Sequence, residues 1–144
     1  MEIRELTAAD RDGATDLWAQ SGLTRPWNPP DEDFDRAVSG LTSAVLGAVD
    51  GRNVTATVMV GHDGHRGWVY YLAVDPSRRH RGLGRRMMHA AEDWLRARGV
   101  VKLHLMIRDG NVSALGFYDR LGFEQAEVTV LARWLTDPVS SPPA

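Results

Sequence analysis

The sequence contains 144 residues, of which 43% are apolar and 25% are charged, and it has no cysteine. A chain of this length buries enough surface to fold as one domain without a disulfide or a metal ion. The lack of cysteine excludes disulfides, thiolate-bound zinc and a cysteine nucleophile, and it is compatible with a reducing compartment. The 17 Lys and Arg residues nearly balance the 19 Asp and Glu residues, so net charge does not predict nucleic-acid binding.

The N-terminal residues do not have the pattern of a secretion signal. MEIRELTAAD carries acidic residues where a signal peptide has a basic start followed by roughly 7–15 apolar residues. No stretch reaches the ~18 consecutive apolar residues of a membrane-spanning helix. We therefore expect a cytoplasmic protein without membrane contact.

The first third of the chain predicts a strand, two helices and a loop between the helices. Residues 2–6 alternate in polarity, and Thr7 begins a capping-box pattern that opens a helix ending at Gly22. Three prolines make residues 23–30 a loop, because proline cannot continue a helix. A second helix follows this loop.

The middle of the chain predicts three antiparallel strands and a long helix. Residues 44–49, 54–60 and 68–74 are rich in strand-forming residues, and an Asp-Gly dipeptide lies in each gap, as is typical of hairpins. The apolar residues that follow Leu83 have helical spacing, and Gly99 ends that helix.

The last third predicts a strand, a capped helix and a final strand. Residues 101–107 form the first of these strands, and Asn111 caps a helix that Gly122 ends. Residues 128–134 form the last strand, and the tail from 136 to 144 is expected to be disordered. Together these elements predict a single α+β domain.

A turn rich in arginine and glycine joins the third hairpin strand to the long helix. It reads Asp-Pro-Ser-Arg-Arg-His-Arg-Gly-Leu-Gly-Arg-Arg over residues 75–86. The unpaired N–H groups and the dipole at a helix start bind phosphate, glycine permits close approach, and arginine adds charge-assisted contacts. A solvated basic loop fits the same composition, so the spacing has to decide. The Walker spacing is absent, and Met87 stands where a dinucleotide fingerprint needs its third glycine.

The spacing Arg79-x-x-Gly82-x-Gly84, after a strand that ends Leu72-Ala73-Val74, resembles the signature of the GCN5-related N-acetyltransferase (GNAT) family. The order of the elements and the motifs Phe-Tyr at 117–118 and Leu-Gly-Phe at 121–123 extend the resemblance over most of the chain. The segments 25–28 and 61–67 resemble the bacterial YpeA-like branch.

The resemblance implies a GNAT-like domain over residues 1–135. Its fold class is α+β (mixed α/β), with a central, mostly antiparallel sheet of about six to seven strands flanked by about four helices. It implies acetyl-CoA as co-substrate, no metal ion, and a monomer or homodimer. The cofactor-binding residues that it implies are Leu72, Ala73, Val74, Arg79, His80, Arg81, Gly82, Leu83, Gly84, Arg85, Asn111 and Tyr118.

Catalytic roles also follow from the resemblance. Tyr118 matches the tyrosine that donates a proton to the departing CoA thiolate, although an aromatic residue packing beside Phe117 fits the same position. Many relatives use a glutamate on a central strand as base, whereas residues 68–72 hold no carboxylate. Asp63 and His65 in the preceding turn, and Tyr70 on the strand, are therefore the candidates that would steer a water chain. His104 on the next strand is a further option, and His65 equally fits an ordinary turn residue.

The loop between the first two helices usually selects the acceptor amine in this family. Here it offers Arg25, Trp27 and Asn28 as substrate-binding residues, and Trp27 also fits simple packing over the core. The acidic residues at 31–33 either attract a cationic amine or stabilise the start of a helix through its dipole.

Two functions remain besides acetyl transfer to a primary amine. A non-catalytic acyl-CoA sensor would bind the cofactor without turnover. A nucleic-acid binder would use the arginines at 78–86, but the balanced charge and the lack of interleaved aromatic residues disfavour it.

Overall fold

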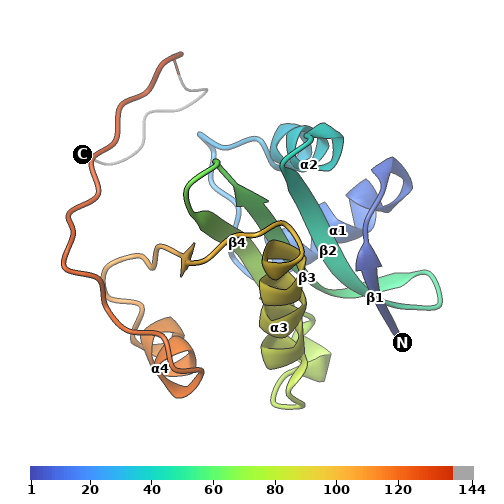
Figure 1. Ribbon diagram of the computed structural model, residues 1–144. Helices are drawn as coiled ribbons and strands as arrows, with labels where there is room; N and C mark the ends of the chain where they lie inside the picture. The colour runs from blue at the N-terminus through green and yellow to red at the C-terminus, as the bar shows by residue number, and fades with distance from the viewer. Residues whose placement is uncertain (138–144) are drawn as a thin grey trace.

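Three long antiparallel strands form the centre of the sheet (Figure 1). In this computed structural model, which describes residues 1–137, they are β2 (Ser43–Asp50), β3 (Asn53–His62) and β4 (Gly67–Val74). The strand β1 (Glu2–Glu5) pairs antiparallel with β2, and the short β5 (Leu103–His104) pairs parallel with β4. The sheet order is β1-β2-β3-β4-β5, so neighbours in sequence are neighbours in the sheet.

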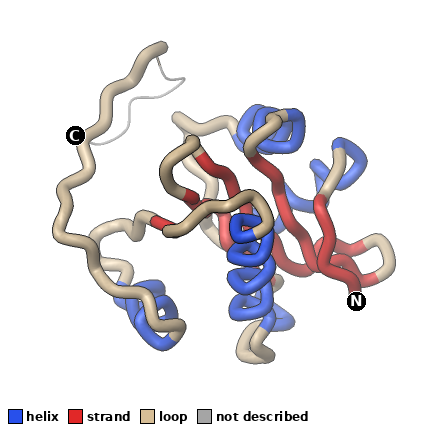
Figure 2. Tube along the Cα trace, in the orientation of Figure 1, coloured by secondary structure: helices blue, strands red, loops and turns tan. Residues whose placement is uncertain are grey.

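Helices cover both faces of this sheet (Figure 2). Helices α1 (Arg11–Gln20) and α2 (Pro30–Ser39) pack on one face, and α3 (Leu83–Arg96) packs on the other. Helix α4 (Val112–Arg120) lies to one side and has no buried residue. Within the described residues, no helix has the length and apolarity required to cross a bilayer.

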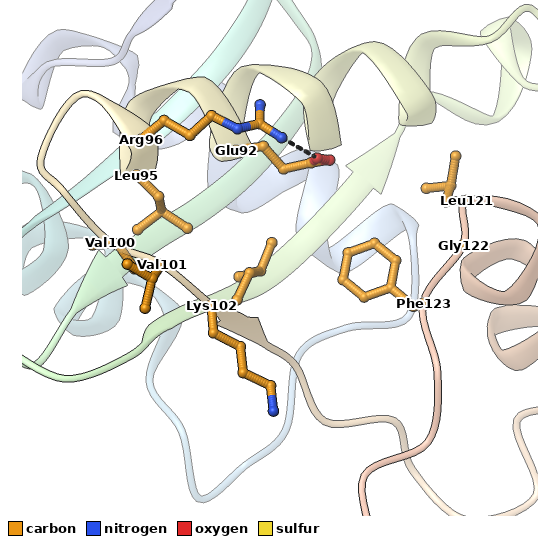
Figure 3. Close-up of a pocket in the computed structure, with 10 residues that line it drawn as sticks. Glu92, Leu95, Arg96, Val100, Val101, Lys102, Leu121, Gly122 and Phe123 are labelled. Carbon is orange, nitrogen blue, oxygen red and sulfur yellow. Dashed lines mark ion pairs between the residues drawn. The ribbon is translucent and has the colours of Figure 1, made fainter.

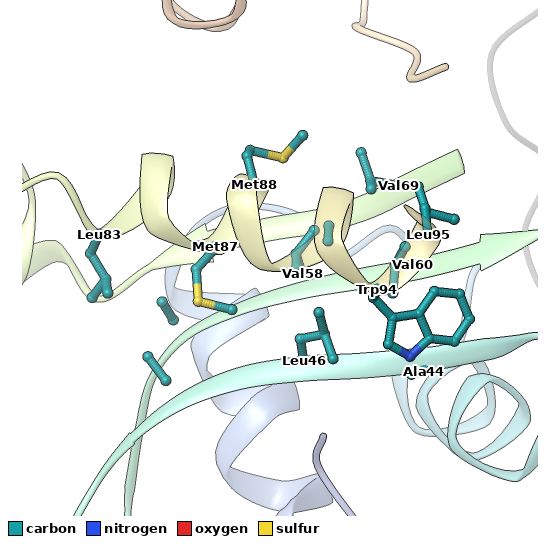
Figure 4. Close-up of a cluster of buried hydrophobic side chains, with 13 residues drawn as sticks. Ala44, Leu46, Val58, Val60, Val69, Leu83, Met87, Met88, Trp94 and Leu95 are labelled. Atoms are coloured by element: carbon teal, nitrogen blue, oxygen red, sulfur yellow. The ribbon is translucent and has the colours of Figure 1, made fainter. Parts of the chain in front are cut away.

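Two hydrophobic clusters hold the layers together, one on each face of the sheet. In β2, Val45 points toward Trp18 and Phe34 of α1 and α2, whereas the adjacent Leu46 points toward α3, as strand alternation requires. Figure 4 shows Met87 of α3 among the strand side chains, and Met87 is fully buried. Burying a side chain of this size stabilises the fold by about 1.5–3 kcal/mol, which anchors the start of α3 against the sheet.

The fold class, the four helices and the hairpin strands are as the sequence predicts, and the predicted strand count is too high. The described chain has five strands rather than six to seven. The strand predicted over 101–107 contains only Leu103 and His104, because β5 leaves β4 after two residue pairs. Residues 128–134 form no strand and are exposed, Val128 by 72%, because they pair with no sheet edge in the described chain. Of the predicted tail, residues 138–144 lie outside the described residues.

Candidate active site

The strands β4 and β5 begin as a parallel pair and then separate. They pair only through Gly67 with Leu103 and Trp68 with His104. Beyond these pairs, the outer edge of β4 has no strand partner among residues 1–137, and a cleft of about 920 Å³ opens beside it. Backbone N–H and C=O groups at such an edge require partners, so an extended ligand can pair with β4 there.

Different segments close the two ends of this cleft. The loop after α1 and the helix α2 form one end, where Arg25, Asn28 and Asp33 line the wall. The beginning of α4 forms the other end, where Asn111 and Tyr118 line the wall. The volume lies within the range of small-molecule sites, about 300–1,000 Å³. The structure thus brings residues of the predicted acceptor loop and the predicted thiol-side tyrosine into one cavity.

A β-bulge in β4 shapes the middle of the cleft. Between the pairs Thr57–Ala73 and Met59–Tyr70, β4 contains one residue more than β3. The bulge includes Tyr71, which has a left-handed φ of 51°, an uncommon conformation for a residue with a side chain. Bulges redirect side chains, and here the bulge places Tyr71 on the α1 and α2 face of the sheet and in the cleft wall.

Contacts from three other elements hold Tyr71 in this conformation. The indole Nε1 of Trp18 donates to Thr57 Oγ1 at 2.8 Å, and Thr57 Oγ1 donates to the Tyr71 carbonyl at 2.9 Å. The Trp18 and Tyr71 rings stack with centroids 3.9 Å apart. The Tyr71 hydroxyl donates to Asp33 Oδ2 at 2.7 Å. Burial and this hydrogen bond raise the pKa of Tyr71 well above its usual value, so it remains a donor.

Tyr118 occupies the opposite end of the cleft. Its ring packs edge-on against Phe117 and Phe123, with centroids 5.0 and 5.5 Å away, so the predicted packing role is met. Its hydroxyl makes no hydrogen bond within the part of the chain that the structure describes. Burial raises the pKa of Tyr118 to about 12, which keeps the hydroxyl protonated and able to donate at neutral pH.

The arginine and glycine turn follows β4 and ends in α3. Asp75 accepts hydrogen bonds from the N–H and the hydroxyl of Ser77, both at 2.9 Å, and begins a short 3-10 turn. Gly82 precedes α3 with φ 76° and ψ 9°, a conformation that glycine adopts without strain. Arg78 pairs with Asp50 at 2.9 Å. The exposed arginines of this turn form no ion pair within residues 1–137, and they are Arg79, Arg81, Arg85 and Arg86.

Gly84 brings this turn close to the cleft. A Cβ atom added at Gly84 would lie 3.3 Å from Phe117 of α4 and 3.8 Å from Val74 of β4. The glycine therefore lets the first turn of α3 pack closely between the end of β4 and α4. A Cβ at Gly82 would meet no heavy atom within 4 Å, so the requirement for glycine there is conformational. The start of α3, with its unpaired amides, therefore packs against α4, the helix that carries Tyr118.

Asn111 caps α4, as the sequence predicts. Its Oδ1 accepts a hydrogen bond from the Ala114 N–H at 3.1 Å. Asn111 also lines the cleft, so its amide nitrogen can still face a ligand.

Of the predicted water-chain residues, Tyr70 alone lines the cleft. Tyr70 is 45% exposed, and burial together with the charge of Asp63 raises its pKa. Asp63 instead accepts hydrogen bonds from the backbone N–H groups of His65 and Arg66, which fixes the β3–β4 turn and lowers the Asp63 pKa. Neither Asp63 nor His65 lines the cleft, and His104 pairs with Trp68 outside it.

The predicted acceptor loop reaches the cleft through two of its three residues. Arg25 and Asn28 line the wall, and the Arg25 guanidinium donates to the carbonyls of Gly22 and Thr24 at 2.9 and 2.8 Å. Trp27 is half-buried and does not line the cleft. The sequence did not identify Tyr71, and it did not single out Asp33 from its acidic neighbours, because both depend on the bulge in β4. No local sequence signal marks that bulge.

A second, smaller cavity of about 280 Å³ lies between the end of α3 and Phe123 (Figure 3). Its wall contains Leu95 and Val101, and its one ion pair in the figure joins Arg96 to Glu92 at 3.8 Å. It contains no tyrosine or histidine and adjoins neither the bulge nor the glycine turn. The larger cleft is therefore the candidate active site.

The larger cleft and the glycine turn before α3 together fit acetyl-CoA. The free edge of β4, the left-handed Gly82 and the amides at the start of α3 provide what an extended pantetheine and a pyrophosphate require. Residues 1–137 contain no group of three or more His, Cys, Asp or Glu side chains that could hold a metal ion.

Comparisons with known proteins agree with this geometry. The tetramutant of BH1408 protein from Bacillus halodurans is 29% identical, with a TM-score of 0.74 over 93% of this chain and 100% of that one. AAC(6')-Iy in complex with the bisubstrate analogue CoA-S-monomethyl-acetylneamine is 17% identical, with a TM-score of 0.79 over 94% and 98%. Ribosomal-protein-alanine N-acetyltransferase from Brucella melitensis biovar Abortus 2308 is 20% identical, with a TM-score of 0.75 over 92% and 99%. At 17% and 20% identity, the similarity to these last two proteins concerns the fold alone.

The family comparison covers most of the chain. The model of the acetyltransferase (GNAT) family matches residues 5–123, which include α1 through α4 and every residue of the cleft. The chain therefore belongs to the acetyltransferase (GNAT) family, as an enzyme that uses acetyl-CoA as its co-substrate.

Proposed function

We propose that this enzyme transfers the acetyl group of acetyl-CoA directly to a primary amine bound in the cleft beside β4. The observation that carries the proposal is the single cavity that joins the free edge of β4, the Tyr118 hydroxyl and the acceptor loop. The thioester end of acetyl-CoA and the acceptor amine would meet in this cavity. Direct attack then needs no covalent enzyme intermediate.

The cofactor would lie along β4 and end at the glycine turn. The backbone at Leu72–Val74 would pair with the pantetheine amides, and Asn111 would contact the same arm from α4. The amides from Arg79 to Gly84 would receive the pyrophosphate, where the dipole of α3 favours negative charge. The exposed Arg79 and Arg81 side chains would add charge-assisted contacts.

The chemistry requires a proton donor on the sulfur side of the thioester. The nitrogen lone pair of the acceptor forms the N–C bond, and the C–S bond breaks with its electron pair on sulfur. Tyr118 would donate its proton to that sulfur, because its raised pKa keeps it protonated and its hydroxyl lacks another partner in the described chain. A thiol has a pKa near ~8.5, so protonation makes it a better leaving group.

The acceptor class is a primary amine of unassigned identity. The comparison proteins suggest two candidates, an aminoglycoside such as neamine and an N-terminal alanine. A lysine side chain and a polyamine are the remaining members of the same chemical class. The residues that would contact the acceptor are Arg25 and Asn28 of the loop after α1.

A turnover assay across amines tests this function. CoA release from acetyl-CoA would be measured with neamine, an alanine-initiated peptide, a lysine peptide and spermidine, and the product would be identified by mass spectrometry. We expect release above the rate without acceptor for at least one amine, with a mass increase of one acetyl group. Acetyl-CoA binding without acetylation of any amine would contradict the proposal and favour a sensor.

A further inference from the structure

One carboxylate faces the cleft, and it does not come from a strand. Among the cleft-lining residues in the described chain, Asp33 is the single acidic side chain. It belongs to the first half of α2, at the end of the cleft formed by the acceptor loop. The strand on which the family resemblance predicts a base holds no carboxylate. The one acidic side chain of the cleft instead comes from helix α2, whose acids the sequence analysis did not propose as a base.

The structure separates Asp33 from its acidic neighbours. Asp31 and Glu32 are exposed and do not line the cleft, whereas the Asp33 side chain is 25% exposed. Within the described chain the Asp33 oxygens accept from the Tyr71 hydroxyl and the Arg36 guanidinium, and from no backbone N–H at the start of α2. Helix-dipole stabilisation therefore accounts for Asp31 and Glu32 and leaves the orientation of Asp33 unexplained.

The bulge in β4 explains that orientation. The Tyr71 hydroxyl donates to Asp33 Oδ2 at 2.7 Å, and Tyr71 holds a strained conformation that Thr57 and Trp18 stabilise. Strain at a functional site persists where the surrounding contacts over-determine it. The second oxygen, Oδ1, accepts one contact at 3.3 Å, from Arg36, whose side chain is 73% exposed. The hydrogen bond from Tyr71 thus fixes one carboxylate oxygen. The other oxygen makes only an exposed ion pair, of a kind that contributes little stability.

We propose that Asp33 receives the ammonium group of the acceptor and takes its proton, with Tyr71 as its positioning residue. This inference rests on the proposed acetyl transfer. Amines with a pKa near ~10 are cationic at neutral pH, so a half-buried carboxylate binds them and excludes neutral analogues. Asp33 first takes one proton from the bound ammonium and releases it to solvent, which frees the nitrogen lone pair for attack. As the N–C bond forms, the nitrogen becomes acidic and a second N–H proton passes to the ionised Asp33, while Tyr118 supplies the proton that the sulfur gains.

The positive side chains near Asp33 are compatible with a cationic acceptor. Arg25 already donates to two backbone carbonyls, which keeps its guanidinium at the loop. Arg36 shares the carboxylate from the solvent side, and the acceptor ammonium would displace it. The variant Arg36→Gln should therefore lower the KM for the amine, which is the opposite of the effect expected if Arg36 binds the acceptor.

Removal of the Asp33 charge tests the inference, with Asp31→Asn as the matched control on the same helix. For the best amine of the panel, Asp33→Asn should lower kcat/KM by about 10²–10⁴-fold, the usual contribution of a general base. Asp33→Glu should restore part of it, and Asp31→Asn should leave it unchanged. Thermal unfolding of each variant establishes that it is folded. Full kcat/KM in folded Asp33→Asn would overturn the inference and leave the proposed function intact.

The proton role has its own readout. The titratable groups that line the cleft with Asp33 are Arg25 from the loop, Arg36 from α2, Arg108, Tyr70 and Tyr71 from β4, and Tyr118 from α4. Arginine stays charged over the assay range, and the three tyrosines have raised pKa values, so they stay neutral. The defect of Asp33→Asn should therefore shrink as the pH rises from about 7 toward 10 and the free amine accumulates. A defect that stays constant over this range would contradict proton transfer to Asp33. Tyr71→Phe should show a smaller defect that is mainly in kcat.

A binding measurement separates this inference from the proposed function. Calorimetric titration of neamine and spermidine would be carried out on the wild type and on Asp33→Asn, both saturated with CoA, which carries no acetyl group, so that the heat reports binding alone. If the wild type binds an amine without acetylating it, weaker binding to Asp33→Asn still supports the ammonium site while the proposed function fails. Equal amine binding by both proteins would overturn the ammonium site. A wild-type chain that neither binds nor acetylates any of the panel amines overturns both proposals.

Discussion

Substitution of Gly82 by alanine isolates the contribution of the turn before α3 to cofactor binding. Gly82 has φ 76°, and a Cβ there meets no heavy atom within 4 Å, so the change introduces backbone strain without a clash. A left-handed conformation costs a residue with a side chain about 1–2 kcal/mol. Because the turn is exposed, it can relax to negative φ in the free enzyme, and binding then has to restore it. We expect acetyl-CoA to bind about 5–30-fold more weakly to Gly82→Ala, the equivalent of that strain.

The matched control lies at the other end of the same helix. Gly99 also has φ 76° and open space at its Cβ position, but it follows the C-terminal end of α3. Gly99→Ala should therefore reduce the free energy of unfolding by about 1–2 kcal/mol and leave acetyl-CoA affinity unchanged. Isothermal titration calorimetry with acetyl-CoA measures both affinities. Equal affinities for Gly82→Ala and the wild type would refute the assignment of this turn to the pyrophosphate.

Three further predictions concern the tyrosine, the bulge and alkaline pH. Tyr118→Phe should lower kcat about 10²-fold in steady-state assays while acetyl-CoA affinity stays constant, and full turnover would remove the proton-donor role. Thr57→Val removes the hydrogen-bond partner of both Trp18 Nε1 and the Tyr71 carbonyl. It should lower the free energy of unfolding, measured in urea, by about 1–3 kcal/mol, and it should lower kcat. Thr55→Val, which loses a bond to the Ala48 carbonyl, should destabilise without a loss of kcat. The pKa of Tyr118 rises from 10.0 to about 12 in the fold, so its stabilising contribution is complete below pH 10.0 and is lost as the pH rises through about 12. The wild type should therefore lose more thermal stability than Tyr118→Phe over that interval.

Local sequence patterns predicted most of the sheet and its helices. The hairpins over β2, β3 and β4 have Asp-Gly dipeptides in their turns, and α3 has apolar residues at helical spacing, so neither depends on distant contacts. The capping box at Thr7 was also present, although it opens a 3-10 turn before α1. Residues 128–134 alternate like a strand, but a strand needs a neighbouring edge, and sequence alternation does not supply one.

The centre of the site depended on contacts that the sequence does not reveal. Tyr71 takes its conformation from Thr57, Trp18 and Asp33, which come from three different elements. The close packing at Gly84 comes from Phe117 of α4, 33 positions later in the chain, and not from its own turn. The predicted cofactor residues are recognisable because a helix start and its glycines form a local pattern, whereas the carboxylate of the cleft is not.

A crystal structure of the enzyme with acetyl-CoA bound tests the central claim most directly. The account predicts the pyrophosphate on the amides between Arg79 and Gly84, the pantetheine along the free edge of β4, and the thioester sulfur next to the Tyr118 hydroxyl. Acetyl-CoA bound in the smaller cavity beside Leu95 and Phe123, or with its sulfur remote from Tyr118, would contradict it.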